Sequence, residues 1–208
     1  MSRRQLPAPE LFRAALDGDR SSLARLLSMI ERGDDDARTI GRLAYPMSGT
    51  GYTVGLTGAP GAGKSTLTSS IIGHLRAQDL EIAVLAIDPS SPFTGGAILG
   101  DRVRMQDHAT DPGVFIRSMA TRGHLGGLSL ATPEAVRVLD AIGRKWILVE
   151  TVGVGQVEVE VAGKADTTVV VVNPGWGDSV QANKAGLMEI ADVFVINKAD
   201  RNGVEETT

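Results

Sequence analysis

The stretch "GLTGAPGAGKST", residues 55–66, decides the fold because it places a phosphate-binding loop pattern between a strand pattern and a helix pattern. Its centre, "GAPGAGKS" at 58–65, has two glycines separated by four residues and followed by lysine and serine. Glycines let the backbone curl until its N–H groups face phosphate oxygens, and the following helix adds partial positive charge. A glycine-rich turn without a ligand is the alternative, which the flanking patterns disfavour. We predict phosphate contacts from Gly58, Ala59, Gly61, Ala62, Gly63, Lys64 and Ser65, with the Ser65 hydroxyl also on Mg²⁺.

Short apolar runs alternate with helix-length segments on both sides of this loop. The predicted strands are 52–57, 81–87, 113–118, 146–151, 167–172 and 192–197, and the predicted helices are 64–77, 101–108, 133–143, 156–165 and 179–191. Strands that are apolar on both faces and separated by helices indicate a mostly parallel sheet covered on each side. The sequence therefore predicts an α/β protein: a three-layer α/β/α P-loop NTPase whose ligands bind beyond the carboxyl ends of the strands.

A helical segment precedes this alternation. Apolar residues recur at three- and four-residue spacing across 9–44, and "DGDRSS" at 17–22 separates two helices, with Ser21 or Ser22 as the expected N-cap. "YPMSGTG" at 45–51 marks the passage to the sheet. We expect two units, a helical segment at 1–48 and a P-loop domain at 49–208. "RNGVEETT" at 201–208 reads as a turn and the start of a helix, so we expect a chain truncated at its C-terminal end.

Composition restricts the class of protein. The 208 residues carry a net charge of −4, with 42% hydrophobic and 22% charged residues and no cysteine. This balance is typical of a globular domain and gives no bulk attraction to nucleic acid or an anionic membrane, and the missing cysteines exclude disulfides and thiolate metal sites. The N-terminal sequence has no signal-peptide pattern, and no apolar run approaches the ~18 residues of a membrane span. We expect a cytoplasmic protein without nucleic-acid or membrane partners.

"NKAD" at 197–200 follows the last predicted strand and indicates guanine recognition. A carboxylate at Asp200 can accept from both N1–H and the exocyclic amino group of guanine, which adenine cannot match. We place Asn197 at guanine N7 and the Lys198 stem over the ring. The short pattern alone would also fit a polar strand end, but its position after a strand of the same sheet favours the guanine interpretation.

Acidic residues at two other strand ends suggest a magnesium site. In "ILVETVGVGQ" at 147–156, Glu150 can reach Mg²⁺ or a water bound to it, and Gly153 can face the γ-phosphate; the alternative is a strand-end acid in water. Asp88 ends another strand, and Asp101 follows a Gly-Gly stretch, where it can join the metal, orient the attacking water or cap a helix. We predict Lys64, Asp101 and Glu150 as catalytic residues, and Ser65, Asp88, Asp101 and Glu150 as the metal site.

With these residues in view, the chain resembles the MeaB/ArgK family of P-loop GTPases. The resemblance covers 50–200 and rests on "GAPGAGKSTL", "DPSSPFTGGAILGDRVRM", "RSMATRGHLGGLS", "ETVGVGQVE", "GDSVQANKAGLMEIAD" and "NKAD". It implies a SIMIBI-class GTPase that uses GTP/GDP and Mg²⁺ and associates with adenosylcobalamin-dependent methylmalonyl-CoA mutase, gating cofactor loading and protecting the mutase. It also implies nucleotide contact by Thr66 and partner signalling by Gln181 and Lys184. Family members continue into a C-terminal region that supports a homodimer and that this sequence lacks, so the resemblance leaves the oligomeric state of this chain open.

Three other functions fit parts of the sequence. A small-molecule kinase would share the phosphate loop but not "NKAD". A metal-insertion GTPase would need ligand clusters, whereas the three histidines, His74, His108 and His124, have no ligand spacing. A nucleotide-sensing module would bind without turnover. No glutamine or arginine finger is evident, so we expect slow hydrolysis that a partner accelerates.

Overall fold

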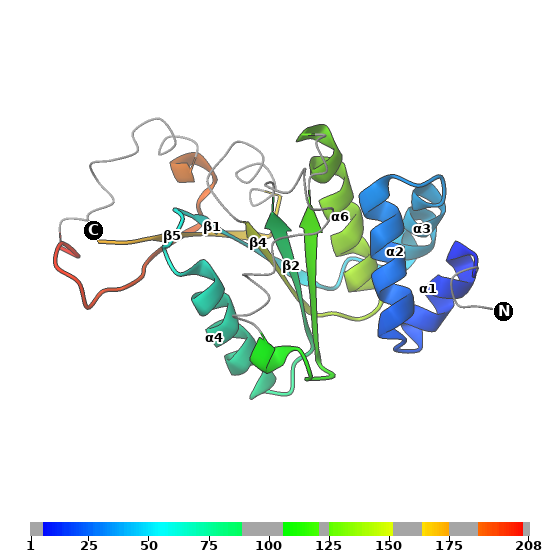
Figure 1. Ribbon diagram of the computed structural model, residues 1–208, viewed down its shortest axis with the longest axis horizontal. Coiled ribbons are helices and arrows are strands. Elements are labelled where there is room, and N and C mark those ends of the chain that lie inside the picture. Colours follow the sequence, from blue (N-terminus) through cyan, green and yellow to red (C-terminus); the bar gives the residue numbers. More distant parts are fainter. Residues whose placement is uncertain (1–5, 89–105, 121–124, 152–163, 175–186, 206–208) are drawn as a thin grey trace.

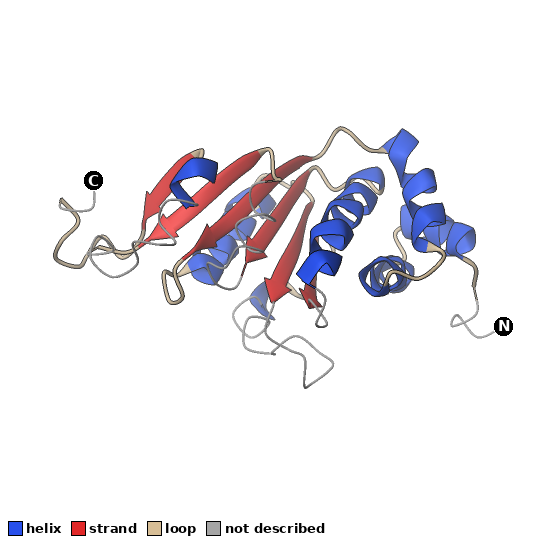
Figure 2. Cartoon of the chain, turned by 90° about the horizontal axis from the view of Figure 1, so that it is seen from above, coloured by secondary structure: helices blue, strands red, loops and turns tan. Residues whose placement is uncertain are grey.

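A parallel six-stranded sheet forms the centre of the molecule (Figures 1 and 2). The structure is a computed structural model that describes residues 6–88, 106–120, 125–151, 164–174 and 187–205. The strand order is β3-β2-β4-β1-β5-β6, and every neighbouring pair is parallel. The strands are β1 Tyr52–Gly58, β2 Ile82–Asp88, β3 Val114–Ala120, β4 Trp146–Thr151, β5 Thr167–Val172 and β6 Val193–Ile196. Each begins and ends within two residues of its predicted range, and the α/β prediction is confirmed.

Helices cover both faces of the sheet because the central strands are apolar on both sides. In β2, Ile82 and Val84 pack with Ile72 and Leu75 of α4 (Lys64–Arg76) on one face. The intervening residues of β2 pack on the other face with α6 (Leu125–Ala141). Figure 1 shows α4 and α6 on opposite sides of the strands. The alternation produces the three layers that the sequence predicts.

Three N-terminal helices extend the α6 layer. They are α1 Ala8–Leu16, α2 Arg20–Arg32 and α3 Ala37–Ala44. Their buried apolar residues belong to the same hydrophobic cluster as those of β2, β4 and α6, so this helical segment shares a core with the sheet. The N-cap of α2 is Asp19, whose carboxylate accepts from the N–H of Ser21 at 2.9 Å and the hydroxyl of Ser22 at 3.0 Å. The expected serine cap is wrong because the carboxylate satisfies both donors at once.

An ion pair joins α2 to the edge strand β3. The guanidinium of Arg117 donates to Glu31 at 2.8 Å, to the Ser28 hydroxyl at 3.0 Å and to the Ala24 carbonyl at 3.1 Å. The side chains of Arg117 and Glu31 are only 16% and 8% exposed, so water screens this pair weakly. Along with apolar contacts, this pair fixes the N-terminal helices to the sheet.

Some predicted helices differ from the observed ones. The helix α6 begins at Leu125, eight residues before the predicted start at Pro133, which lies inside it. Proline favours the first helical turn, so the sequence pattern predicts a start at this residue, whereas the observed helix begins earlier. Of the predicted 101–108 helix, the described part is the short 3₁₀ turn Gln106–His108, and of 179–191 it is a helical turn at 187–190. The predicted helix at 156–165 lies almost entirely outside the described residues.

We predict that Arg117→Met lowers the free energy of unfolding by about 2 kcal/mol, because it removes a guanidinium from a nearly buried carboxylate. The matched control is Arg137→Met, which removes a pair with Glu134 whose two side chains are 33% and 38% exposed. That change should cost less than about 1 kcal/mol. Urea unfolding at neutral pH measures both. Equal losses would contradict the structural role given to Arg117.

Candidate functional site

The phosphate loop runs from the end of β1 to the start of α4. Gly58, Gly61 and Gly63 have φ values of 137°, 74° and 95°, a region that residues with a side chain rarely occupy. Space also requires glycine at two of these positions. A Cβ at 58 would collide with the carbonyl of Val171 on β5, and a Cβ at 63 would collide with the side-chain amide of Asn197. The loop therefore curls where β5 and the end of β6 approach it.

Three side chains hold the carbonyl oxygens of this loop. The ammonium of Lys64, which is 7% exposed, donates to Gly58 O at 2.7 Å and Ala59 O at 3.1 Å. Asn197 Nδ2 donates to Ala62 O at 2.7 Å, and Lys198 Nζ donates to Gly61 O at 2.6 Å. The carbonyl oxygens of Gly58, Ala59, Gly61 and Ala62 thus accept hydrogen bonds from protein donors. The backbone N–H groups of such a curled loop are suited to phosphate oxygens.

The 197–200 segment, which the sequence predicts to recognise guanine, contacts the phosphate loop directly. The N–H of Asn197 donates to Val172 O at 2.8 Å, which continues the β5–β6 ladder to the end of the sheet. The sequence pattern predicts that Asn197 and Lys198 contact the guanine ring. It does not predict the contacts of these two residues with the loop. No local pattern reveals these contacts, because 135 and 137 residues separate the partners. Asp200 is exposed two residues beyond, and its reading of guanine stays a prediction.

Glu150 is a buried acid bonded to the helix that follows the loop. The Ser65 hydroxyl donates to Glu150 Oε1 at 2.6 Å, and the two residues are 7% and 1% exposed. This burial excludes the alternative of a strand-end acid in water. Glu150 pairs in register with Leu56 of β1 and Ala86 of β2, so Asp88, the last residue of β2, ends at the same edge of the sheet. A hydroxyl and a carboxylate side by side are the hard oxygen donors that suit Mg²⁺.

Some predicted site residues belong to segments that the structure does not describe. Asp101, Gly153, Gln181 and Lys184 lie outside the described residues. Asp88 is placed by its backbone only. The site as described therefore comprises the phosphate loop, Ser65 with Glu150, and the 197–200 segment.

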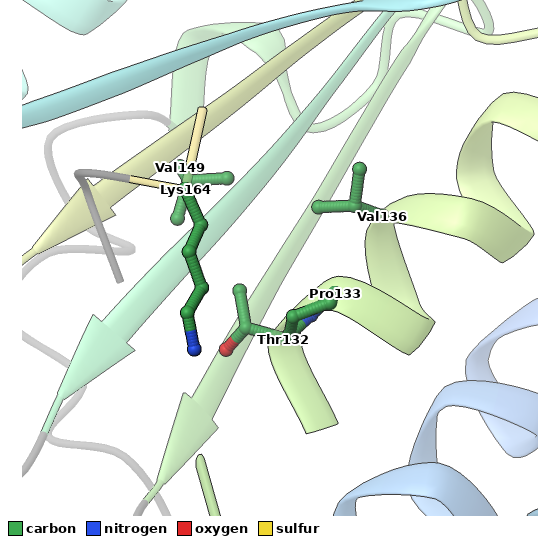
Figure 3. A pocket seen from close by; sticks show the side chains of 5 residues that line it. All are labelled: Thr132, Pro133, Val136, Val149 and Lys164. Carbon is green, nitrogen blue, oxygen red and sulfur yellow. The ribbon is translucent and has the colours of Figure 1, made fainter. Parts of the chain in front are cut away.

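The remaining described residues were searched for metal-ligand clusters, membrane-spanning helices and cavities. Within the described ranges, no group of three His, Cys, Asp or Glu residues is arranged to hold a metal ion. Among the same residues, no helix combines the length and apolarity needed to cross a membrane. A cavity of about 120 Å³ lies on the α6 face, away from the loop, between Val149, Thr132 and Lys164 (Figure 3). The Thr132 hydroxyl is buried there without a hydrogen-bond partner among the described residues.

We predict that Gly63→Ala weakens guanine-nucleotide binding by at least tenfold, because the added methyl displaces Asn197 from the loop. The matched control is Gly143→Ala, at a similar φ of 93° with no atom within 4 Å of the new Cβ. Both changes carry the backbone cost of about 1 kcal/mol for a left-handed residue. Thermal unfolding and a titration with GDP separate the two effects. Unchanged binding by Gly63→Ala would show that the Asn197 contact is dispensable.

Comparison with known proteins finds a matching family model, similar proteins and a similar solved structure. The family model described as methylmalonyl Co-A mutase-associated GTPase MeaB matches residues 23–208. A protein of Pyrococcus abyssi is 60% identical over 198 residues, which cover 95% of this chain and 61% of the relative. GTPase ArgK of Escherichia coli is 42% identical over 195 residues, covering 92% of this chain and 59% of the relative. The crystal structure of an LAO/AO transport system kinase matches with a TM-score of 0.72 at 32% identity, covering 94% of this chain and 57% of that one.

The matched regions cover only part of each relative, but the family match contains the whole candidate site as described. The chain spans only 57% to 61% of the length of these relatives. The family match nevertheless includes the phosphate loop, the buried Ser65–Glu150 pair and the 197–200 segment. On the extent of that match and on the identity to its relatives, the chain belongs to the family of methylmalonyl-CoA mutase-associated GTPases named MeaB.

Proposed function

We propose that this chain binds GTP and GDP at the carboxyl edge of its sheet and hydrolyses GTP. The observation that carries the proposal is the bond from Asn197 Nδ2 to Ala62 O at 2.7 Å, which joins the base-recognition segment to the phosphate loop. A guanine ring near Asp200 and a phosphate chain in the loop would then share one continuous surface. The fold alone would fit many nucleotide chemistries, and this junction favours a guanine nucleotide.

The residues of the chain divide the work between binding and orientation. The N–H side of the loop and Lys64 would bind the β- and γ-phosphates, with Thr66 as a further nucleotide contact. Ser65 and Glu150, with Asp88 and Asp101, would hold Mg²⁺, which when bound neutralises phosphate charge. Glu150 keeps the Ser65 hydroxyl oriented before nucleotide arrives. Asp101 would orient the attacking water, and Gly153 would follow the γ-phosphate.

We further propose that the GTPase acts as a chaperone for an adenosylcobalamin-dependent acyl-CoA mutase, methylmalonyl-CoA mutase. The matching family is described by its association with that mutase, which supports this partner. Gln181 and Lys184 would signal between nucleotide and mutase, and hydrolysis would time cofactor loading. Longer relatives would act as homodimers. A metal-insertion GTPase or a small-molecule kinase of the same P-loop class is the alternative function.

Nucleotide preference is the first test. We expect calorimetry with Mg²⁺ to show tight binding of GDP and negligible binding of ADP. Asp200→Asn should reverse the choice from GDP to xanthosine diphosphate, because the amide then donates to the 2-oxo group that replaces the amino group of guanine. Equal binding of GDP and ADP by the unaltered chain would refute the guanine assignment.

Turnover needs a separate test. We expect slow phosphate release from GTP by the chain alone, and about 10³-fold faster release when a mutase partner orders the site. Lys64→Ala should abolish release in both conditions, because the β- and γ-phosphates lose their cation. If Lys64→Ala released phosphate from GTP at the normal rate, the catalytic role of this lysine would be refuted. Acceleration by a phosphate-acceptor metabolite instead of a mutase would favour the kinase alternative.

A further inference from the structure

Asn173 is a half-buried residue whose amide oxygen has an unmet hydrogen-bond requirement at the edge of the candidate nucleotide site. It directly follows β5, and its Oδ1 is buried without a hydrogen-bond partner among the described residues. A buried acceptor that lacks a donor is unfavourable, and native proteins retain few of them. Its position at the carboxyl edge, where ligands bind in parallel sheets, suggests that binding supplies the donor.

The sheet places Asn173 between the phosphate loop and the base-recognition segment. On one side Val171 pairs with Gly58, where the loop begins, and on the other Asn197 donates to Val172 O at 2.8 Å. Val170 and Val172 pack with Leu187 on one face of the sheet. Because side chains alternate along a strand, position 173 belongs to the opposite face, the one on which α4 packs against β1, β2 and β4. The side chain of Asn197 contacts the loop that leads into that same helix.

Lys198 is the donor best suited to this oxygen. Its ammonium has three N–H groups, and one of them donates to Gly61 O at 2.6 Å. Lys198 follows Asn197, the residue that lies beside Asn173 at the end of the β5–β6 ladder. A base that stacks on the lysine stem would remove water from the ammonium, so a second protein acceptor would then gain importance. The side-chain amide of Asn197 donates one of its two N–H groups to Ala62 O, and its second N–H is uncharged and therefore a weaker donor than an ammonium.

We propose that Asn173 is a positioning residue of the guanine-nucleotide site, and that its Oδ1 accepts from the Lys198 ammonium when nucleotide is bound. The inference rests on the proposed function. Lys198 would then be held at two points, Gly61 O and Asn173 Oδ1, with its stem fixed as a platform for the ring. Asn173 would act through Lys198 and would not need to touch the nucleotide.

The test compares stability and nucleotide binding in the same variants. Asn173→Leu removes the acceptor with little change in volume, so the melting temperature without nucleotide should stay equal or rise. GDP affinity should fall about tenfold or more, because a bond to a charged donor is lost. Asn173→Asp keeps an acceptor and should bind GDP within about threefold of the unaltered chain. Lys198→Met should also weaken GDP binding, and adding Asn173→Leu to it should cause no further loss.

A matched control removes a different unpartnered acceptor. Thr132→Val deletes a buried hydroxyl at the cavity on the α6 face (Figure 3). It should leave GDP affinity unchanged while the melting temperature stays equal or rises. This control shows whether the loss in Asn173→Leu arises from position 173 and not from the deletion of any buried acceptor.

Two results would overturn the proposal. If Asn173→Leu binds GDP as tightly as the unaltered chain, the Asn173 amide makes no contribution to GDP binding. If the losses in Asn173→Leu and Lys198→Met add in the double variant, Asn173 acts independently of the lysine. Failure of the proposed function is distinguishable, because the unaltered chain would then show no preference for GDP over ADP; the role of Asn173 would fall with it.

Discussion

The carbonyl oxygens of the phosphate loop accept hydrogen bonds from Lys64, Lys198 and Asn197, and the carboxyl edge of the sheet is organised around these contacts. A curled loop is unfavourable for most backbones, and here protein donors occupy its oxygen side in advance. Two of these donors come from the end of β6, so the loop is correctly shaped only when the far side of the sheet has formed. The proposed phosphate and base contacts would therefore depend on one arrangement of the chain.

The buried pair of Ser65 and Glu150 adds a second constraint at the same edge. A carboxylate with 1% exposure is costly unless it is hydrogen-bonded, and the Ser65 hydroxyl provides a bond of 2.6 Å. The pair connects β4 to the first turn of α4. A cation that bound these two oxygens would thus sit between the helix and the sheet, where its charge acts on the loop that α4 continues.

Local patterns were enough to predict much of this arrangement. The glycine spacing at 58–65, the doubly apolar strands and the acid at 150 each have a short-range signature, and the structure confirms the α/β fold. The contacts of Asn197 and Lys198 with the loop could not be predicted, because they depend on the approach of distant strands. The N-cap at Asp19 was missed because several neighbouring polar residues are acceptable caps. The early start of α6 was missed because a proline commonly marks the first helical turn.

The shared core of the N-terminal helices has a consequence for how the molecule responds to ligands. Apolar residues of α1, α2 and α3 belong to one cluster with β2, β4 and α6. Strand β2 ends at the carboxyl edge, while Ala83, Leu85 and Ile87 on one of its faces belong to that cluster. A ligand at this edge stabilises whatever unfolds together with the sheet, by an amount that grows with the logarithm of its concentration over its dissociation constant. Nucleotide would therefore slow amide hydrogen exchange in helix α2, which makes no contact with the phosphate loop, so that the N-terminal helices would report on occupancy of the distant site.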